Sequence, residues 1–233
     1  MLRRDLVRKV RQVGLLRTLK HGTRKLFRDF RSGILLTQGL SADPFDSQYK
    51  TETAEIVSVG ALDIPDDRLE HAIRYEAVVP EVFYAILNEL PIKHEEFLFI
   101  DIGCGKGRAL LMASRFPFKA IIGVELSASL ADLATRNIGV FKDRTQQCKR
   151  IEIVRVDAVD YELPHDKLFL FLYNPFDEKI MCKVVSNVER SLERYPRTIY
   201  IAYLQPLHCN VWNSSGAFQM LNKSPRWVLY RNK

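Results

Sequence analysis

The stretch that decides the fold is Leu98-Phe-Ile-Asp-Ile-Gly-Cys-Gly-Lys-Gly107, an apolar run that ends in an acid and three alternating glycines. Residues 97–102 predict a buried strand, and the glycines predict a turn at which the backbone can approach a ligand closely. Residues 108–115 then supply good helix formers. A strand, a glycine-rich turn and a helix are how an α/β sheet builds a cofactor site at its strand ends.

The spacing of the glycines excludes two phosphate-binding motifs. A dinucleotide fingerprint, G-x-G-x-x-G, needs a third glycine where this chain has Arg108. A P-loop needs a glycine where the chain has Ile100, and a Ser or Thr after Lys106. The observed pattern is acid-x-G-x-G-x-G, from Asp101 to Gly107. It resembles motif I of the class I S-adenosylmethionine (SAM) dependent methyltransferases, although a purely structural strand-to-helix turn would read the same in isolation.

Three further strand ends strengthen the resemblance, which covers the chain from about Tyr75 to the C-terminus. Each is an apolar run followed by a polar group: residues 120–125 end in Glu125, residues 151–157 end in Asp157, and residues 168–173 open into Asn174-Pro-Phe176. Acids often end single strands for structural reasons alone. Four strand ends in this order, each with suitable chemistry, are much rarer by chance.

The resemblance implies SAM as the cofactor and divides it among these strand ends. The turn glycines let the backbone lie against the ligand, and an acid at the second strand end can accept hydrogen bonds from both ribose hydroxyls. The expected cofactor-binding residues are Asp101 at the amino-acid end, Gly103, Gly105 and Gly107 in the turn, Glu125 at the ribose, and Asp157 with the Ala158 backbone at the adenine.

The acceptor site is expected at Asn174-Pro175-Phe176, which resembles the Asn-Pro-Pro-aromatic motif of amino-group methyltransferases but lacks one proline. The missing proline argues against assigning an adenine or glutamine acceptor. We expect the Asn174 amide carbonyl to orient an attacking amine and Phe176 to exclude water; the alternative is a turn-forming Asn-Pro beside a core Phe. Tyr75 and Glu76 are similar to a Tyr and Glu that help to cover SAM in seven-strand protein-lysine methyltransferases.

Composition fits one sizeable core with an appendage, since the chain has 233 residues of which 47% are hydrophobic. The sequence contains no run of about 18 apolar residues, so no transmembrane helix is expected. Its N-terminus lacks the continuous apolar segment of a signal peptide, so none is expected there. The four cysteines and five histidines are scattered, which predicts free thiols and no metal site. We expect a cytoplasmic protein, peripheral at a membrane surface if its basic N-terminus binds there.

Positive charge is concentrated at that N-terminus. Residues 1–33 contain eleven Lys or Arg and two Asp, a net charge of +9, whereas the whole chain carries +7. Apolar residues recur there at helical spacing with arginines between them, namely Leu2, Leu6, Val10 and Val13. This predicts a basic amphipathic helical arm that binds an anionic membrane surface or nucleic acid, unless its apolar stripe docks on the rest of the chain. A mitochondrial transit peptide is disfavoured, because residues 1–33 contain one serine, Ser32, and two Asp.

The predicted organisation is an arm at 1–33, a connector at 34–67 and a methyltransferase domain at 68–233. Within the domain, strands and helices alternate after a helical region at 68–90 that Pro80 interrupts. Strands are expected at 97–102, 119–125, 151–156, 168–173, 198–204, 218–222 and 227–231, and helices at 106–116, 127–140 and 177–194. The predicted fold class is α/β: a doubly wound, mostly parallel seven-stranded sheet with helices on both faces and a C-terminal antiparallel hairpin.

Two functions from different classes remain open. One is a SAM-dependent methyltransferase that transfers the sulfonium methyl directly to a nitrogen of a protein lysine, a nucleic acid or a small amine. The other is a non-catalytic SAM-fold module that engages RNA or an anionic membrane through the arm. The intact set of Asp101, Glu125 and Asp157 favours the enzyme. The sequence identifies neither the acceptor nor the oligomeric state.

Overall fold

The computed structural model describes residues 43–90 and 92–233, so the predicted arm at 1–33 lies outside the described residues. Its centre is a seven-stranded sheet in the order β3-β2-β1-β4-β5-β7-β6. The strands are β1 (Phe97–Ile102), β2 (Ala120–Glu125), β3 (Ile151–Arg155), β4 (Lys167–Tyr173), β5 (Ile199–Leu204), β6 (Phe218–Lys223) and β7 (Trp227–Asn232). The first five strands pair in parallel, and β7 pairs antiparallel with both β5 and β6. The predicted fold class is confirmed.

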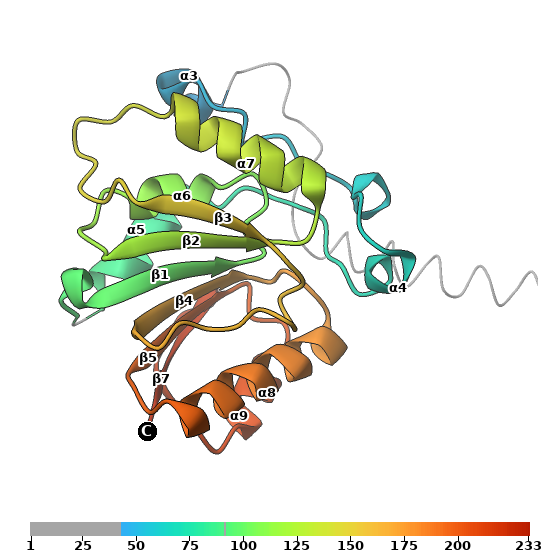
Figure 1. The fold of residues 1–233 in the computed structure, drawn as a ribbon, viewed down its shortest axis with the longest axis vertical. Coiled ribbons are helices and arrows are strands. Elements are labelled where there is room, and N and C mark those ends of the chain that lie inside the picture. Colours follow the sequence, from blue (N-terminus) through green and yellow to red (C-terminus); the bar gives the residue numbers. More distant parts are fainter. Residues whose placement is uncertain (1–42, 91) are drawn as a thin grey trace, which may run out of the picture. The chain divides into compact units, whose positions relative to one another are not determined.

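Helices cover both faces of the sheet, which explains why β1, β2 and β5 are buried at every position. On one side lie α5 (Pro80–Asn88), α6 (Arg108–Ala113) and α7 (Ala128–Val140), and on the other side α8 (Glu178–Arg194) and α9 (Cys209–Ser214) (Figure 1). Two apolar cores result, one on each face of the sheet. The first contains Phe83 and Leu110, and the second contains Met181 and Trp212.

Local signals in the sequence start the long helices. The Ser127 side chain accepts a hydrogen bond from the backbone N–H of Leu130 at the start of α7, and Asp177 does the same for Ile180 at the start of α8. Pro80 occupies the first turn of α5, where its missing N–H is not needed. Helix α9 was not predicted, because its six residues are too short to show a helical period.

The predicted helical region at 68–90 is wrong in its middle. The structure has a single-turn helix α4 (Asp66–Leu69), then an extended stretch, and then α5. This stretch, the crossing segment of residues 70–79, makes isolated bridges from Tyr75 to Val57 and from Ala72 to Phe176. Pairing with distant backbone therefore replaces helical hydrogen bonds there, and Pro80 disfavours a helical conformation at the residue before it.

Residues 43–67, the described part of the predicted connector, include helix α3 (Pro44–Tyr49) and a 3-10 turn η1 (Val59–Ala61). Two rings of α3 pack on Phe141 at the end of α7: the Phe45 ring lies 6.3 Å from it and the Tyr49 ring 4.8 Å. A second 3-10 turn, η2 (His94–Glu96), leads into β1. The four cysteines are free thiols.

Within residues 43–90 and 92–233, no helix is long and apolar enough to cross a bilayer. Nor does any group of three or more His, Cys, Asp or Glu in these ranges gather as a metal site.

Candidate cofactor-binding site

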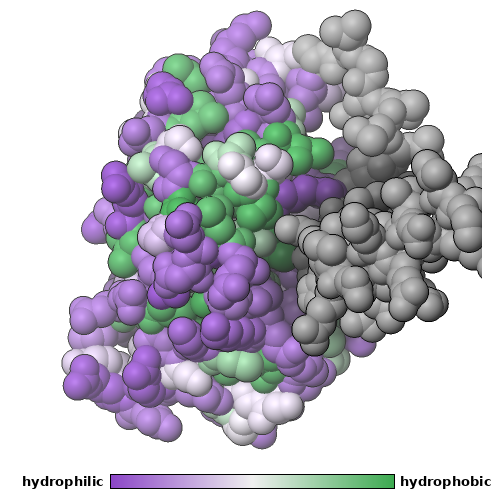
Figure 2. All heavy atoms as spheres, turned by 90° about the vertical axis from the view of Figure 1, so that its right-hand side faces the viewer, coloured by the Kyte–Doolittle hydropathy of each residue, from purple (hydrophilic) through white to green (hydrophobic). Residues whose placement is uncertain are grey.

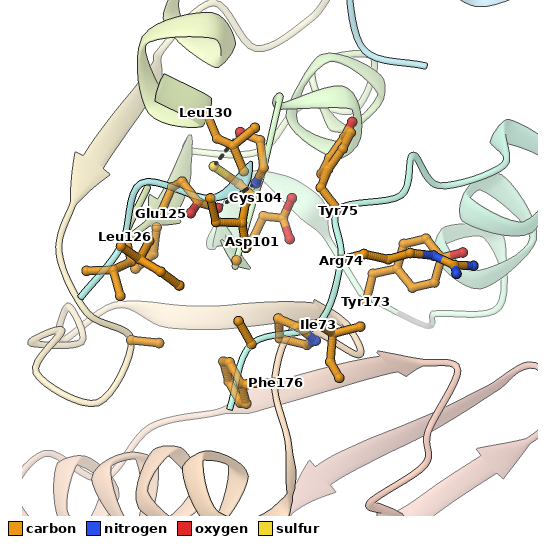
Figure 3. A pocket seen from close by; sticks show the side chains of 18 of the residues that line it. Ile73, Arg74, Tyr75, Asp101, Cys104, Glu125, Leu126, Leu130, Tyr173 and Phe176 are labelled. Atoms are coloured by element: carbon orange, nitrogen blue, oxygen red, sulfur yellow. Dashed lines mark hydrogen bonds between the residues drawn. The ribbon is translucent and has the colours of Figure 1, made fainter. Parts of the chain in front are cut away.

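A deep pocket opens at the carboxyl ends of β1, β2 and β4, where a parallel sheet usually binds its ligand. These strand ends contribute one part of the lining, and the crossing segment contributes another with Ile73, Arg74 and Tyr75 (Figure 3). Its empty volume, including the open mouth, is about 1010 Å³. Hydrophobic residues gather in the middle of this side of the molecule, with hydrophilic residues around them (Figure 2).

The glycine turn after β1 brings backbone to the pocket. Gly105 has φ +53°, and a Cβ atom at this position would lie 2.1 Å from the Tyr75 ring. A Cβ at Gly103 would lie 2.6 Å from the Pro175 side chain. Both glycines line the pocket, whereas Gly107 does not: it precedes α6 and faces Ala134.

Asp101, the fifth residue of β1, is a buried carboxylate that faces the pocket with 3% of its surface exposed. Burial, reinforced by the nearby charge of Glu125, raises the pKa of Asp101 well above its usual value. None of the described residues donates it a hydrogen bond that would offset this burial. A cationic group in the pocket would supply the missing partner, and the ammonium of the SAM amino-acid portion is such a group.

Glu125 ends β2 and is held by the backbone around it. Its Oε2 accepts from the Gly105 N–H at 2.8 Å, and its Oε1 accepts from the Ser127 N–H at 2.9 Å. Burial raises the pKa of Glu125, while these backbone hydrogen bonds lower it. The carboxylate is therefore oriented before any ligand arrives, and its remaining lone pairs can accept from ribose hydroxyls.

Asp157 follows β3 at the far side of the pocket, and Ala158 lines the pocket beside it. Asp157 Oδ1 accepts from the backbone N–H of Val159 at 3.0 Å, and its Oδ2 accepts from Arg68 Nε at 2.5 Å. The Arg68 pair joins α4 to the end of β3. Spacing could not reveal Arg68, which lies 89 residues before its partner.

The Asn174-Pro-Phe turn departs from the predicted geometry. The Asn174 side chain is buried outside the pocket lining, and its Oδ1 accepts a hydrogen bond from the Tyr203 hydroxyl at 3.1 Å. The Pro175 carbonyl accepts from the backbone N–H of Ile73 at 3.3 Å. Phe176 does line the pocket. The structure thus brings Phe176, but not the Asn174 amide, to the cofactor-binding acids.

The crossing segment contributes the remaining predicted residues. Tyr75 lines the pocket against Gly105, and its hydroxyl donates to the Thr53 carbonyl at 2.7 Å. Glu76 also lines the pocket and accepts from Arg74 Nη2 at 3.3 Å. The sequence did not single out Tyr173, the last residue of β4, which also lines the pocket, because it looks like one more apolar strand residue. Burial, and then the charge of Glu76, raises the pKa of Tyr173, so its hydroxyl stays protonated.

A family model described as "Putative methyltransferase" matches residues 95–184, which run from η2 into α8. A predicted N6-adenine-specific DNA methylase from Listeria monocytogenes is similar with a TM-score of 0.50 and 16% identity, over 67% of this chain and 51% of that one. TrmN from Thermus thermophilus is similar with a TM-score of 0.48 and 13% identity, over 67% and 49%. This chain spans about half the length of both proteins. A comparison with curated proteins found no match.

The sheet order and the glycine turn with its three strand-end acids agree with the resemblance to class I methyltransferases, and the family model covers the part of the chain that contains this turn and these acids. The family match points to methyl transfer, for which SAM would be the cofactor. The pocket fits this cofactor, because it presents an unpaired buried carboxylate, an oriented second carboxylate and exposed turn backbone along one wall.

Proposed function

We propose that the protein transfers the sulfonium methyl of SAM directly to a nitrogen of an acceptor, which is a protein lysine, a nucleic acid or a small amine. The observation that carries the proposal is the buried and unpaired Asp101 in a pocket with a second, acceptor-facing half. SAM, when bound, supplies an already activated methyl group. The residues of this chain then have to bind it, orient the acceptor and exclude water.

In the cofactor half, Asp101 binds the ammonium of the amino-acid portion, and Glu125 accepts from the ribose hydroxyls. Asp157 and the Ala158 backbone receive the adenine. Three carboxylates at three neighbouring strand ends support these assignments, because each has different partners among the described residues. Asp101 has no hydrogen-bond donor, and Glu125 accepts from two backbone N–H groups. Asp157 accepts from an arginine side chain and from one backbone N–H group. Only Asp101 requires a cation from outside the described chain.

In the acceptor half, Phe176 and Ile73 form apolar walls. The Glu76 carboxylate lines the same half together with Tyr173, whose pKa is raised by burial and by the charge of Glu76. An amine must lose a proton before it attacks, and a carboxylate can receive that proton. Since the Asn174 amide is engaged by Tyr203, the support for a nitrogen acceptor comes from Glu76.

The test uses methyl-labelled SAM, the purified protein and a cell extract. We expect the wild-type protein to transfer labelled methyl groups to macromolecules or small amines of the extract. Sensitivity of a labelled macromolecule to protease or to nuclease then identifies the acceptor class. Glu76→Gln should lower transfer roughly 100-fold, within the usual range for removing a general base, while SAM affinity stays near wild type. Glu70→Gln, an exposed carboxylate of the same segment, is the control and should transfer normally.

If SAM binds but no extract fraction accepts label, the non-catalytic binding module replaces the enzyme. If label transfer occurs and Glu76→Gln leaves its rate and pH dependence unchanged, the role of Glu76 is wrong and the methyltransferase assignment stands.

A further inference from the structure

Arg108 is a buried cation beside the glycine turn for which the cofactor chemistry needs no role. It is the first residue of α6, it is 5% exposed, and it lies at the pocket wall. Its Nη2 contacts Asp43 at 2.7 Å, and its Nε donates to Thr53 Oγ1 at 2.6 Å. The guanidinium is thus occupied by protein partners instead of pointing free donors at a ligand.

Thr53 links this cation to Tyr75 of the crossing segment. Its side chain is fully buried and also donates to Asp46 Oδ1 at 2.6 Å, while its backbone N–H donates to Asp46 Oδ2 at 2.7 Å. Its carbonyl accepts the Tyr75 hydroxyl at 2.7 Å. One residue therefore receives hydrogen bonds from the arginine after the glycine turn and from the tyrosine that packs on that turn.

Tyr75 connects Thr53 to the glycine turn, because its ring occupies the space that a Cβ at Gly105 would need. Gly105 N–H in turn orients Glu125. A shift of the Tyr75 ring would therefore alter both the pocket wall near Asp101 and the turn that orients the second carboxylate.

We propose that Arg108 and Thr53 are positioning residues of the cofactor site, which hold Tyr75 against the glycine turn and make residues 43–55 part of that site. The proposal rests on SAM as the cofactor of the proposed function. It moves the start of the functional unit from residue 68, as the sequence suggested, to residue 43 at the latest.

The proposal is tested by comparing substitutions of two neighbouring threonines. Thr51 and Thr53 are both buried and both donate to Asp46 Oδ1, but only Thr53 contacts Arg108. In the full chain, Thr53→Val should raise the Kd for SAM about tenfold, whereas Thr51→Val should stay within about twofold of wild type. Both variants lose a buried hydrogen bond to Asp46, and Thr53→Val also removes the acceptor of Arg108 Nε, so its melting temperature should fall further. The SAM affinities are therefore compared at a temperature at which both variants are fully folded. Thr53→Ser restores the hydroxyl and should restore the affinity.

Arg108→Lys tests the same contact between Arg108 and Thr53 by changing the arginine. Lysine keeps the charge but lacks the guanidinium fork that contacts Thr53 and Asp43 together, so SAM affinity should again fall about tenfold. Arg115→Lys is the control. Like Arg108, Arg115 contacts an acid and a hydroxyl, here Asp143 and the hydroxyl of Tyr84, but it does not line the pocket. If Thr53→Val does not fold, this pair decides the matter.

Equal SAM affinities for Thr53→Val and Thr51→Val, or for Arg108→Lys and Arg115→Lys, would overturn the proposal while leaving the cofactor assignment intact. A wild-type protein that binds no SAM in calorimetry would instead overturn the cofactor site, and this proposal with it.

Discussion

Asp101 shows how one residue can favour ligand binding over stability. Because burial raises its pKa, the folded protein holds the Asp101 proton more tightly than the unfolded chain does. This contribution to the free energy of unfolding is present at low pH and is lost as the pH rises through the raised pKa. At neutral pH, the ligand-free protein is thus destabilised by a carboxyl group that a bound cation would stabilise.

We therefore expect Asp101→Asn to raise the melting temperature of the ligand-free protein at neutral pH, by about 2–4 °C for each kcal/mol removed. The same substitution should weaken SAM binding about ten- to hundredfold, because the charged partner of the ammonium is gone. Calorimetry with and without SAM measures both effects. The gain in melting temperature should shrink as the pH is lowered, since wild-type Asp101 then becomes neutral. A variant that is less stable at neutral pH but binds SAM normally would contradict this account.

At the scale of elements, the pocket depends on how the crossing segment and α4 are tied to the sheet. The backbone N–H of Ile73 donates to the Pro175 carbonyl, and that of Asp177 donates to the His71 carbonyl. His71 Nδ1 also lies 2.8 Å from the Asp177 carboxylate. On the other side, Arg68 pairs with Asp157. The wall opposite the strand ends is thus attached at both sides of the pocket.

Arg68→Met should loosen one of these attachments while keeping the apolar stem of the side chain. We expect the Kd for SAM to rise about two- to fivefold, the range of a partly exposed ion pair, chiefly through faster dissociation. Asp67→Asn removes the other ion pair of Arg68, to a carboxylate that is 71% exposed, and should leave dissociation unchanged. Stopped-flow displacement of SAM measures these rates. Tighter binding by Arg68→Met would mean that Arg68 competes with the adenine for Asp157.

The same elements show what the sequence can and cannot predict. Strand β1 was predicted with its observed bounds, because an unbroken apolar run between turn residues has few other interpretations. The crossing segment was not predicted, since its extended conformation depends on pairing with Val57 and Phe176, far away in the sequence. The Asn174 amide was expected in the pocket for the same kind of reason: no local pattern indicates that Tyr203 would bind it.

At the scale of the whole molecule, the charge is divided unequally along the chain. Residues 1–33 carry a net charge of +9 and the other 200 residues −2, since the total is +7. Any attraction to a polyanion should therefore come from the N-terminal residues and not from the body that holds the pocket. We propose that this region binds an anionic partner independently of the cofactor.

Deletion of residues 1–33 should abolish binding to RNA or to anionic vesicles and leave the Kd for SAM unchanged. A second variant distinguishes the two partners: replacing Leu2, Leu6, Val10 and Val13 by Ser keeps every charge but removes the apolar stripe. Because an interfacial helix needs buried apolar area as well as charge, this variant should lose vesicle binding and retain RNA binding. Binding to RNA should also fall steeply with salt, since it releases counterions. If both polyanions still bind after the deletion, the positive charge of residues 1–33 does not recruit them, and the near-neutral body must do so through specific contacts.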